Sequence, residues 1–401
     1  MTTYKKLLIY KILLFVFAFI IAFMPSTASQ NKEVNSRVIV ETLGIDGGEE
    51  ISLTAQYVMP AGAQGEASKN TVTVKGKTLN EAVEGLSTAL GRRAELGHCS
   101  MVIVGSELKI EELGTLLTAT DVTADVYLAA AKDKAEDAVN NITEFMKKTG
   151  ATDADFIAYS AKKGHLATNT LLGFLSDVHS ASKSAYIPVV EMQKSDDGSQ
   201  GGGQSGDGGE QNGGSQGNGS QGGGDQQKSD GGGSGGSGMS VEMLALYNAD
   251  GRAGIIQSGS ARGVAWVSAP IEKGAVCCDV EYDGKKIEGV CGRLLKKHAT
   301  IKTDPKNGAA TVKLKAYIEP NGDKFNMLYA TNSKTAMQAL VDGYKKKIMS
   351  ELESAYADSL KLGCDPMFIG KTFFRYHPEY FDAEYDYNNI TVKYDIEIAI
   401  K

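Results

Sequence analysis

Residues whose types could do chemistry gather in the segment GRRAELGHCSMVIVG, residues 91–105, where two arginines, a histidine and a cysteine lie within eight residues. Such a group could form a reactive centre with a nucleophilic or redox-active thiol. The flanking residues favour a different interpretation. Gly91 follows an amphipathic stretch, as at a helix end, and residues 99–104 form a short apolar run typical of a buried strand. We therefore expect Cys99 to be a buried core residue and His98 to be structural.

The cysteines offer a second kind of chemistry, which is disulfide formation. The chain has five, an odd number and too few for a disulfide scaffold. The segment VCCDVEYDGKKIEGVCG, residues 276–292, predicts a hairpin with an Asp-Gly pair at its tip. Cys291 then lies opposite Cys277 or Cys278, so a cross-strand disulfide is possible outside the cytoplasm, and Cys278–Cys291 is the pair we select. The alternative is that the thiols stay unpaired.

The motifs of known catalytic and cofactor sites are missing from the sequence. It has no CxxC or HExxH pattern, no GxSxG elbow, no Walker loop and no GxGxxG after a strand. Asp46, Glu49 and Glu50 are acidic neighbours at a turn, which favours solvated carboxylates over an acid–base pair. We predict no catalytic residues, no cofactor and no metal. The net charge of −7 also disfavours nucleic-acid binding, which requires a basic face.

The N-terminus has the pattern of a targeting segment. Three lysines precede an unbroken apolar run at residues 12–24, and the small residues of PSTASQ follow. Residues 1–28 are thus predicted to be a signal peptide or a retained membrane anchor. The apolar run leaves both alternatives open, because a spanning helix needs about 20 apolar residues. Either alternative places the rest of the chain outside the cytoplasm.

Glycine-rich residues 193–238 divide the remaining chain. They consist mainly of Gly, Ser, Gln, Asp and Asn, and they cannot bury enough apolar surface to offset their conformational entropy. We predict a disordered linker between an N-terminal domain at 33–192 and a C-terminal domain at 239–401, which would let the two halves move apart. The alternative is a long loop inserted into one compact body.

Both halves are predicted to be α+β, with mixed or antiparallel sheets and packed helices. The clearest helices are at residues 79–90, preceded by a Thr78/Glu81 capping box, and at about 333–362. Residues 389–400 alternate between apolar and polar side chains, which predicts a half-buried antiparallel strand. Aromatic-rich residues 364–387 are expected to seal a core edge, with an exposed contact surface as the alternative.

Six segments have an order and spacing that fit one family. The N-terminal half contains LGIDGGEEISLTAQ, GKTLNEAVEGLSTALGRRAELGHCSMVIVG and AKDKAEDAV, and the C-terminal half contains LALYNADGRAGII, RGVAWV and YADSLKLGCDPMFIGKTFFRYHPEYF. Together they resemble the Ger(x)C family of spore germination proteins, the C subunits of germinant receptors. The family's glycine–arginine and histidine positions match Gly91, Arg92 and His98, which we interpret as structural.

The resemblance implies a non-enzymatic subunit of a spore germinant receptor complex, on the outer face of the spore's inner membrane. It would act with an A subunit and a transporter-like B subunit in nutrient-triggered germination. Family members usually carry an acylated cysteine after signal cleavage, but no cysteine lies near Ala28. Membrane contact is therefore expected through the N-terminal segment or the partners. The alternatives are a secreted or anchored solute-binding or adhesion protein and, with less support, an extracytoplasmic hydrolase.

Overall fold

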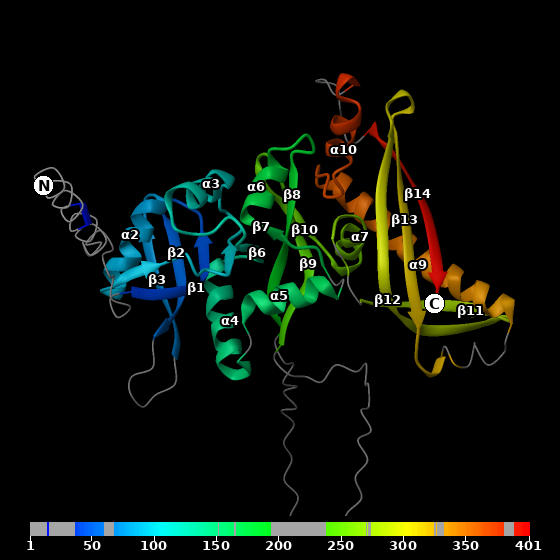
Figure 1. Ribbon diagram of the computed structural model, residues 1–401, viewed down its shortest axis with the longest axis horizontal. Coiled ribbons are helices and arrows are strands. Elements are labelled where there is room, and N and C mark those ends of the chain that lie inside the picture. Colours follow the sequence, from blue (N-terminus) through cyan, green and yellow to red (C-terminus); the bar gives the residue numbers. More distant parts are fainter. Residues whose placement is uncertain are drawn as a thin grey trace, which may run out of the picture.

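The structure is a computed structural model that describes residues 14–15, 37–59, 68–150, 152–163, 166–193, 238–269, 271, 274–324, 326, 333–380 and 389–401. The targeting segment predicted at 1–28, apart from residues 14–15, and the interior of the linker predicted at 193–238 lie outside these residues. The described residues form two sheets with packed helices, which confirms the predicted α+β class (Figure 1).

The first sheet is mixed, as predicted. Its four central strands β8, β6, β5 and β1 run parallel, and antiparallel strands flank them on both sides. In sheet order the strands are β10 (Gly251–Ile256), β9 (Gly238–Asn248), β8 (Ser184–Gln193), β6 (Tyr127–Ala131), β5 (Met101–Val104), β1 (Arg37–Asp46), β2 (Ile51–Met59) and β3 (Ser68–Gly76), with β4 (Arg93–Glu95) beside β1 and β7 (Asn169–Thr170) beside β6.

Helices cover both faces of the first sheet, so β5 and β6 are almost wholly buried and consist almost entirely of apolar residues. One face packs against α2 (Leu79–Leu90), α3 (Ile110–Ala119) and α6 (Leu171–Val178). The opposite face packs against α4 (Ala135–Thr149), α5 (Asp153–Lys162) and α7 (Ser258–Ser268). Helix α2 begins at the predicted cap, where the Thr78 hydroxyl accepts a hydrogen bond from the backbone of Glu81, and it ends at left-handed Gly91. The reciprocal half of the predicted capping box differs, because the Glu81 carboxylate accepts from the backbone nitrogen of Lys77 and not from that of Thr78.

Strands β8 and β9 pair across the glycine-rich segment. Their antiparallel register runs from Ser184 opposite Asn248 to Gln193 opposite Gly238, so the two ends of that segment lie side by side. Strands β9 and β10 were expected in the C-terminal half, but they complete the sheet of the N-terminal half. The difference arises because an antiparallel neighbour can follow a connection of any length, and linker composition does not reveal the pairing.

The second sheet has the order β11 (Ala275–Tyr282), β12 (Lys285–Asp304), β13 (Ala309–Pro320) and β14 (Thr391–Ile400). The alternation predicted for β14 is present, but the strand is parallel to β13 and not antiparallel. The reason is that helix α9 (Lys334–Lys361), which fits the helix predicted at about 333–362, returns the chain across the sheet before β14 begins. Two 3₁₀ turns, η2 (Pro305–Asn307) and η3 (Pro378–Tyr380), and helix α10 (Ile369–Tyr376) lie near one end of this sheet (Figure 1).

One apolar core joins the two sheets. It extends from Met101 and Ile103 of the first sheet, through Trp266 of α7 and Leu352 of α9, to Leu314 of the second sheet. Trp266 is fully buried in this core. The two halves therefore share a continuous core, and they do not each enclose a separate one.

Helices α7 and α9 approach each other closely at Gly263. A Cβ atom added at Gly263 would lie 2.1 Å from the backbone oxygen of Glu351. Any larger residue must therefore push the two helices apart, because the atom in the way belongs to the backbone.

We expect Gly263→Ala to lower the free energy of unfolding by about 2–3 kcal/mol through this steric conflict. The matched control is Gly259→Ala in the same helix, where no atom lies within 4 Å of the added Cβ, so its effect should be within about 1 kcal/mol of zero. Urea unfolding of both variants measures the difference. Equal stability of the two variants would contradict the proposed helix contact.

Candidate functional site

The segment at residues 91–105 does not form a reactive centre in the structure. Gly91 ends helix α2 with φ 61°, and Arg93 pairs with Asp121 at 3.2 Å. His98 is exposed, whereas Cys99 is buried and donates from Sγ to the carbonyl of Met101. This confirms the interpretation of the segment as a helix end followed by a buried strand.

The disulfide joins Cys277 to Cys291, so the selected pair Cys278–Cys291 is wrong. The hairpin turns at Asp283–Gly284, and β12 carries an extra residue near Gly289, whose φ is 66°. This bulge moves Cys291 opposite Cys277 and Val290 opposite Cys278. Adjacent strand residues point to opposite faces, so Cys277 lies on the outer face and Cys278 is buried towards α9.

The remaining thiols are poor nucleophiles. Cys99, Cys278 and Cys364 are free and buried. Burial raises the pKa of both Cys278 and Cys364 to about 12, with smaller contributions from the carboxylates of Asp279 and Asp365 respectively, so both thiols stay protonated at neutral pH. Within the described ranges, no three His, Cys, Asp or Glu side chains are grouped so that they could hold a metal ion.

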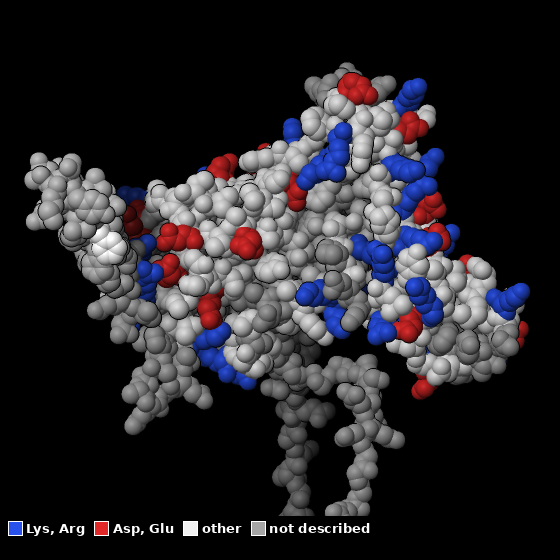
Figure 2. All heavy atoms as spheres, viewed as in Figure 1, with Lys and Arg blue, Asp and Glu red and all other residues white. Residues whose placement is uncertain are grey.

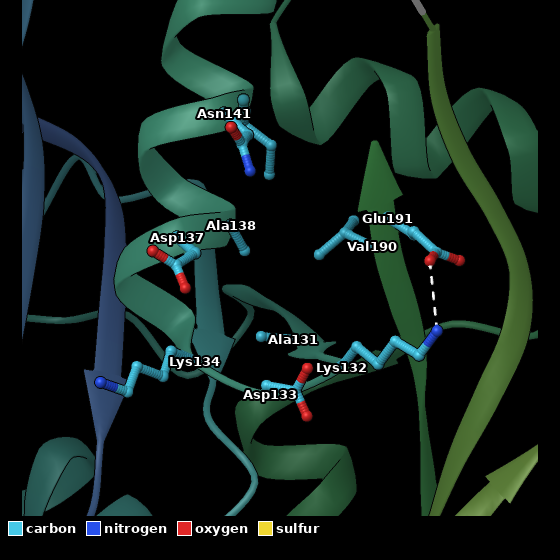
Figure 3. Close-up of a pocket in the computed structure, with 10 residues that line it drawn as sticks. Ala131, Lys132, Asp133, Lys134, Asp137, Ala138, Asn141, Val190 and Glu191 are labelled. Atoms are coloured by element: carbon cyan, nitrogen blue, oxygen red, sulfur yellow. Dashed lines mark hydrogen bonds and ion pairs between the residues drawn. The ribbon is translucent and has the colours of Figure 1, made fainter. Parts of the chain in front are cut away.

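A groove of about 350 Å³ lies between α4 and β8 (Figure 3). Its floor is the turn Ala131–Lys134, and its walls carry Asp137 and Asn141 of α4 and Glu191 of β8. Lys132 forms an ion pair with Glu191 at 3.4 Å, and Figure 3 shows Lys134 pointing away from the opening. Most of these residues belong to the segment AKDKAEDAV. Sequence reasoning missed the groove because its walls are about 50 residues apart in the chain.

The nearby N-terminus of α4 is already occupied by a carboxylate. Asp46 accepts hydrogen bonds from the backbone nitrogens of Ala135 at 2.6 Å and Glu136 at 3.0 Å. It therefore satisfies the donors that could otherwise bind an anion. Asp46, expected to be a solvated acid at a turn, is instead a helix cap, whereas Glu49 and Glu50 are exposed. The groove is thus an open polar surface suited to contact rather than to acid–base chemistry.

A buried carboxylate connects the RGVAWV segment to α9. Glu351 is 3% exposed and accepts a hydrogen bond from the Trp266 indole at 2.7 Å. It also forms an ion pair with Lys347 at 3.3 Å.

A buried lysine binds the C-terminal end of α7. Lys297 donates to the carbonyls of Ala265 and Trp266, both at 2.6 Å, where a cation is favoured by the helix dipole. Burial lowers the pKa of Lys297 to about 7.

A second buried carboxylate, Asp365, joins the C-terminal half to the loop between α6 and β8. It accepts hydrogen bonds from the Ser182 hydroxyl at 2.6 Å and from the backbone nitrogens of Ile369 at 3.0 Å and Gly370 at 2.7 Å. Ser182 also accepts from the backbone nitrogen of Lys371, and the Lys371 ammonium pairs with Asp177 at 2.9 Å. Burial raises the pKa of Asp365 to about 7, although these hydrogen bonds oppose the shift. We call this group the Asp365 junction.

The aromatic segment predicted at 364–387 is described as far as residue 380, and residues 381–387 lie outside the described ranges. Phe373 is buried against the end of the second sheet, together with Met367 and Ile369. Phe374 and Tyr376, in the last turn of α10, are 50% and 62% exposed. The helix thus contributes apolar side chains to a core edge and leaves two aromatic side chains at its end partly exposed.

Comparisons with known proteins agree over most of the chain. The family model described as the spore germination protein N-terminal domain matches residues 30–192, and the model described as spore germination B3/GerAC-like, C-terminal, matches residues 243–401. A solved structure titled as the crystal structure of the GerBC protein has a similar fold, with a TM-score of 0.51 and 14% identity over 89% of this chain and 96% of that one. No curated protein matches the sequence. No helix within the described residues is long and apolar enough to cross a membrane.

Removal of the disulfide is expected to destabilise the hairpin. A bridge between residues 14 apart stabilises by about 3 kcal/mol in the chain-entropy model, so the double variant Cys277→Ser/Cys291→Ser should lose about 2–3 kcal/mol of unfolding free energy. Urea unfolding with and without a reductant checks this. Reductant should destabilise the wild type but leave the double variant unchanged, and equal sensitivity of both would contradict the assigned pairing.

The Asp365 junction gives a further prediction. Asp365→Ala leaves two buried backbone donors and the part-buried Ser182 hydroxyl without their acceptor, so we expect the free energy of unfolding to fall by about 3 kcal/mol or more. Glu353→Ala, an exposed carboxylate on α9, is the control and should change stability by less than about 0.5 kcal/mol. Chemical denaturation of both variants measures the effect, and an equally small loss in both would show that the junction contributes little.

Proposed function

Because the chain belongs to the Ger(x)C family of spore germination proteins, we propose that it is the C subunit of a germinant receptor and acts outside the cytoplasm at the spore's inner membrane. The observation that carries this proposal is the match of both family domains, in order, on either side of the glycine-rich segment. The similarity to the fold of GerBC supports the same assignment.

The proposed role is non-enzymatic and depends on protein contacts. In the described residues the free cysteines are buried, and the buried carboxylates Asp365 and Glu351 are engaged in contacts between elements. The groove beside α4 is an open polar surface, and Phe374 and Tyr376 are exposed aromatic side chains at the end of α10. We assign these surfaces to binding, with a receptor A subunit and a transporter-like B subunit as the partners.

The proposed mechanism is that this chain transmits a change of contacts through its rigid body. A germinant bound elsewhere in the complex changes the contacts that its membrane subunits make with this chain. A continuous core transmits such a change to the whole body, because packed interiors move as units and do not deform locally. The alternative of a secreted solute-binding or adhesion protein predicts no link to germination. It also predicts that neighbouring genes encode no A-type or transporter-like subunit.

The experiment is deletion of the gene followed by germination assays with several nutrients. We expect germination to fail or slow with at least one nutrient, to be normal with a non-nutrient trigger that bypasses receptors, and to recover when the gene is restored. Co-purification from spore membranes should then recover the A and B subunits. Unchanged germination with every nutrient would contradict the proposed role.

A further inference from the structure

The outer face of the second sheet, opposite α9, carries a regular array of cations. The register places Lys302 opposite Thr311, Thr300 opposite Lys313, His298 opposite Lys315, and Lys296 opposite Tyr317. β14 extends the rows, with Lys393 beside Thr311. Successive residues of one face are two apart, so these side chains all point outwards. The basic face is defined here by its six cations: Arg293, Lys296, Lys302, Lys313, Lys315 and Lys393.

Half of these cations are neutralised within the sheet. Lys313 pairs with Asp395 at 3.3 Å, Lys315 pairs with Glu397, and Arg293 pairs with Glu319 at 2.5 Å. The other three, Lys296, Lys302 and Lys393, are exposed and form no ion pair with any described residue.

The basic face therefore carries an excess of three positive charges on a chain whose net charge is −7. At its end, Asp304 accepts a hydrogen bond from the Asn307 side chain at 2.7 Å, and the same turn carries Lys306, whose charge is opposite to that of Asp304. Figure 2 shows this excess of positive charge, with lysine and arginine side chains along the part of the surface formed by β12, β13 and β14. Acidic side chains are more prominent over the first sheet in the same view. The positive charge is thus localised on one side of an acidic protein.

The side chains of the basic face indicate whether it binds a protein or a surface of phosphate groups. Protein interfaces are depleted in lysine at their cores and use aromatic residues and arginine as anchors. Here the excess cations are all lysines, and the one aromatic side chain among them, Tyr317, is already covered by the ammonium groups of Lys315 and Lys401. Lysine is a mobile point charge on a flexible stem, which suits a surface of many equivalent phosphates.

We propose that the basic face lies against the anionic phospholipid headgroups of a bilayer. Lys296 and Lys302 are separated by six residues of strand, or about 20 Å, so the face can contact several headgroups at once. The proposal rests on the charges of this face and does not depend on which receptor the chain serves.

The expected affinity of the basic face for an anionic bilayer follows from its number of excess positive charges. A lysine near an anionic membrane surface contributes about fivefold in affinity, so three of them give about a hundredfold preference for anionic over zwitterionic bilayers. This preference should disappear in about 1 M salt, where the Debye length falls to about 3 Å.

Chemical labelling of lysines in the full chain tests the proposal without altering the protein. The chain is reconstituted with vesicles of phosphatidylcholine, or of phosphatidylcholine with 30% phosphatidylglycerol, and its lysines are acetylated briefly and quantified by mass spectrometry. We expect Lys296, Lys302 and Lys393 to be protected severalfold in the anionic vesicles only, and the protection to be lost at 1 M salt. Lys75, Lys109 and Lys148, which are exposed on the first sheet and its helices, are internal controls and should label equally in both.

Three results would overturn the proposal. They are equal labelling of the three test lysines in both kinds of vesicle, protection of the control lysines to the same degree, and protection of the test lysines that needs spore membrane proteins to be added to the anionic vesicles. A triple variant, Lys296→Glu/Lys302→Glu/Lys393→Glu, provides an independent check. It should lose the preference for anionic vesicles, whereas Lys75→Glu/Lys109→Glu/Lys148→Glu, with the same change in net charge, should keep it.

Discussion

The pairing of β8 with β9 is the constraint on which the rest of the structure depends. It returns the chain, after the glycine-rich segment, to the sheet that it has just left, with Gln193 opposite Gly238. Because β9 and β10 complete the first sheet, α7 begins directly on its face, and Trp266 can join a core that continues through α9 to the second sheet. The long segment thus connects two neighbours, and its length has little effect on where the folded parts lie.

Three of the six segments that resemble the family contain a residue at which distant parts of the chain meet. Asp46 caps α4, Gly263 lets α7 approach α9, and Asp365 connects the start of α10 to the loop before β8. Aspartate carboxylates can act in catalysis or bind metals, yet here Asp46 and Asp365 satisfy backbone groups, and Gly263 removes a steric obstacle. These contacts hold the protein as one body whose surfaces are free to bind. That arrangement is consistent with a receptor subunit that transmits contacts between membrane partners.

Local features were predictable from the sequence, and long-range pairing was not. The Thr78 cap, the helix end at Gly91, the long helix α9 and the alternation in β14 depend on nearby residues, and all four are present. The direction of β14 and the place of β9 depend on partners that periodicity does not identify. The cysteine pairing depended on one bulge near Gly289, which shifts the register by one residue. The Asp365 junction could not be found, because Ser182 lies 183 residues away in the sequence.

The continuous core can be tested by cutting the chain within the glycine-rich segment, which is the covalent connection between the two halves. A site for a specific protease, inserted between residues 213 and 214, would give two fragments after cleavage. If β8 and β9 pair and the core is shared, the fragments should elute together in size-exclusion chromatography and unfold in a single transition. Fragments that separate under native conditions, or that unfold independently, would contradict the account.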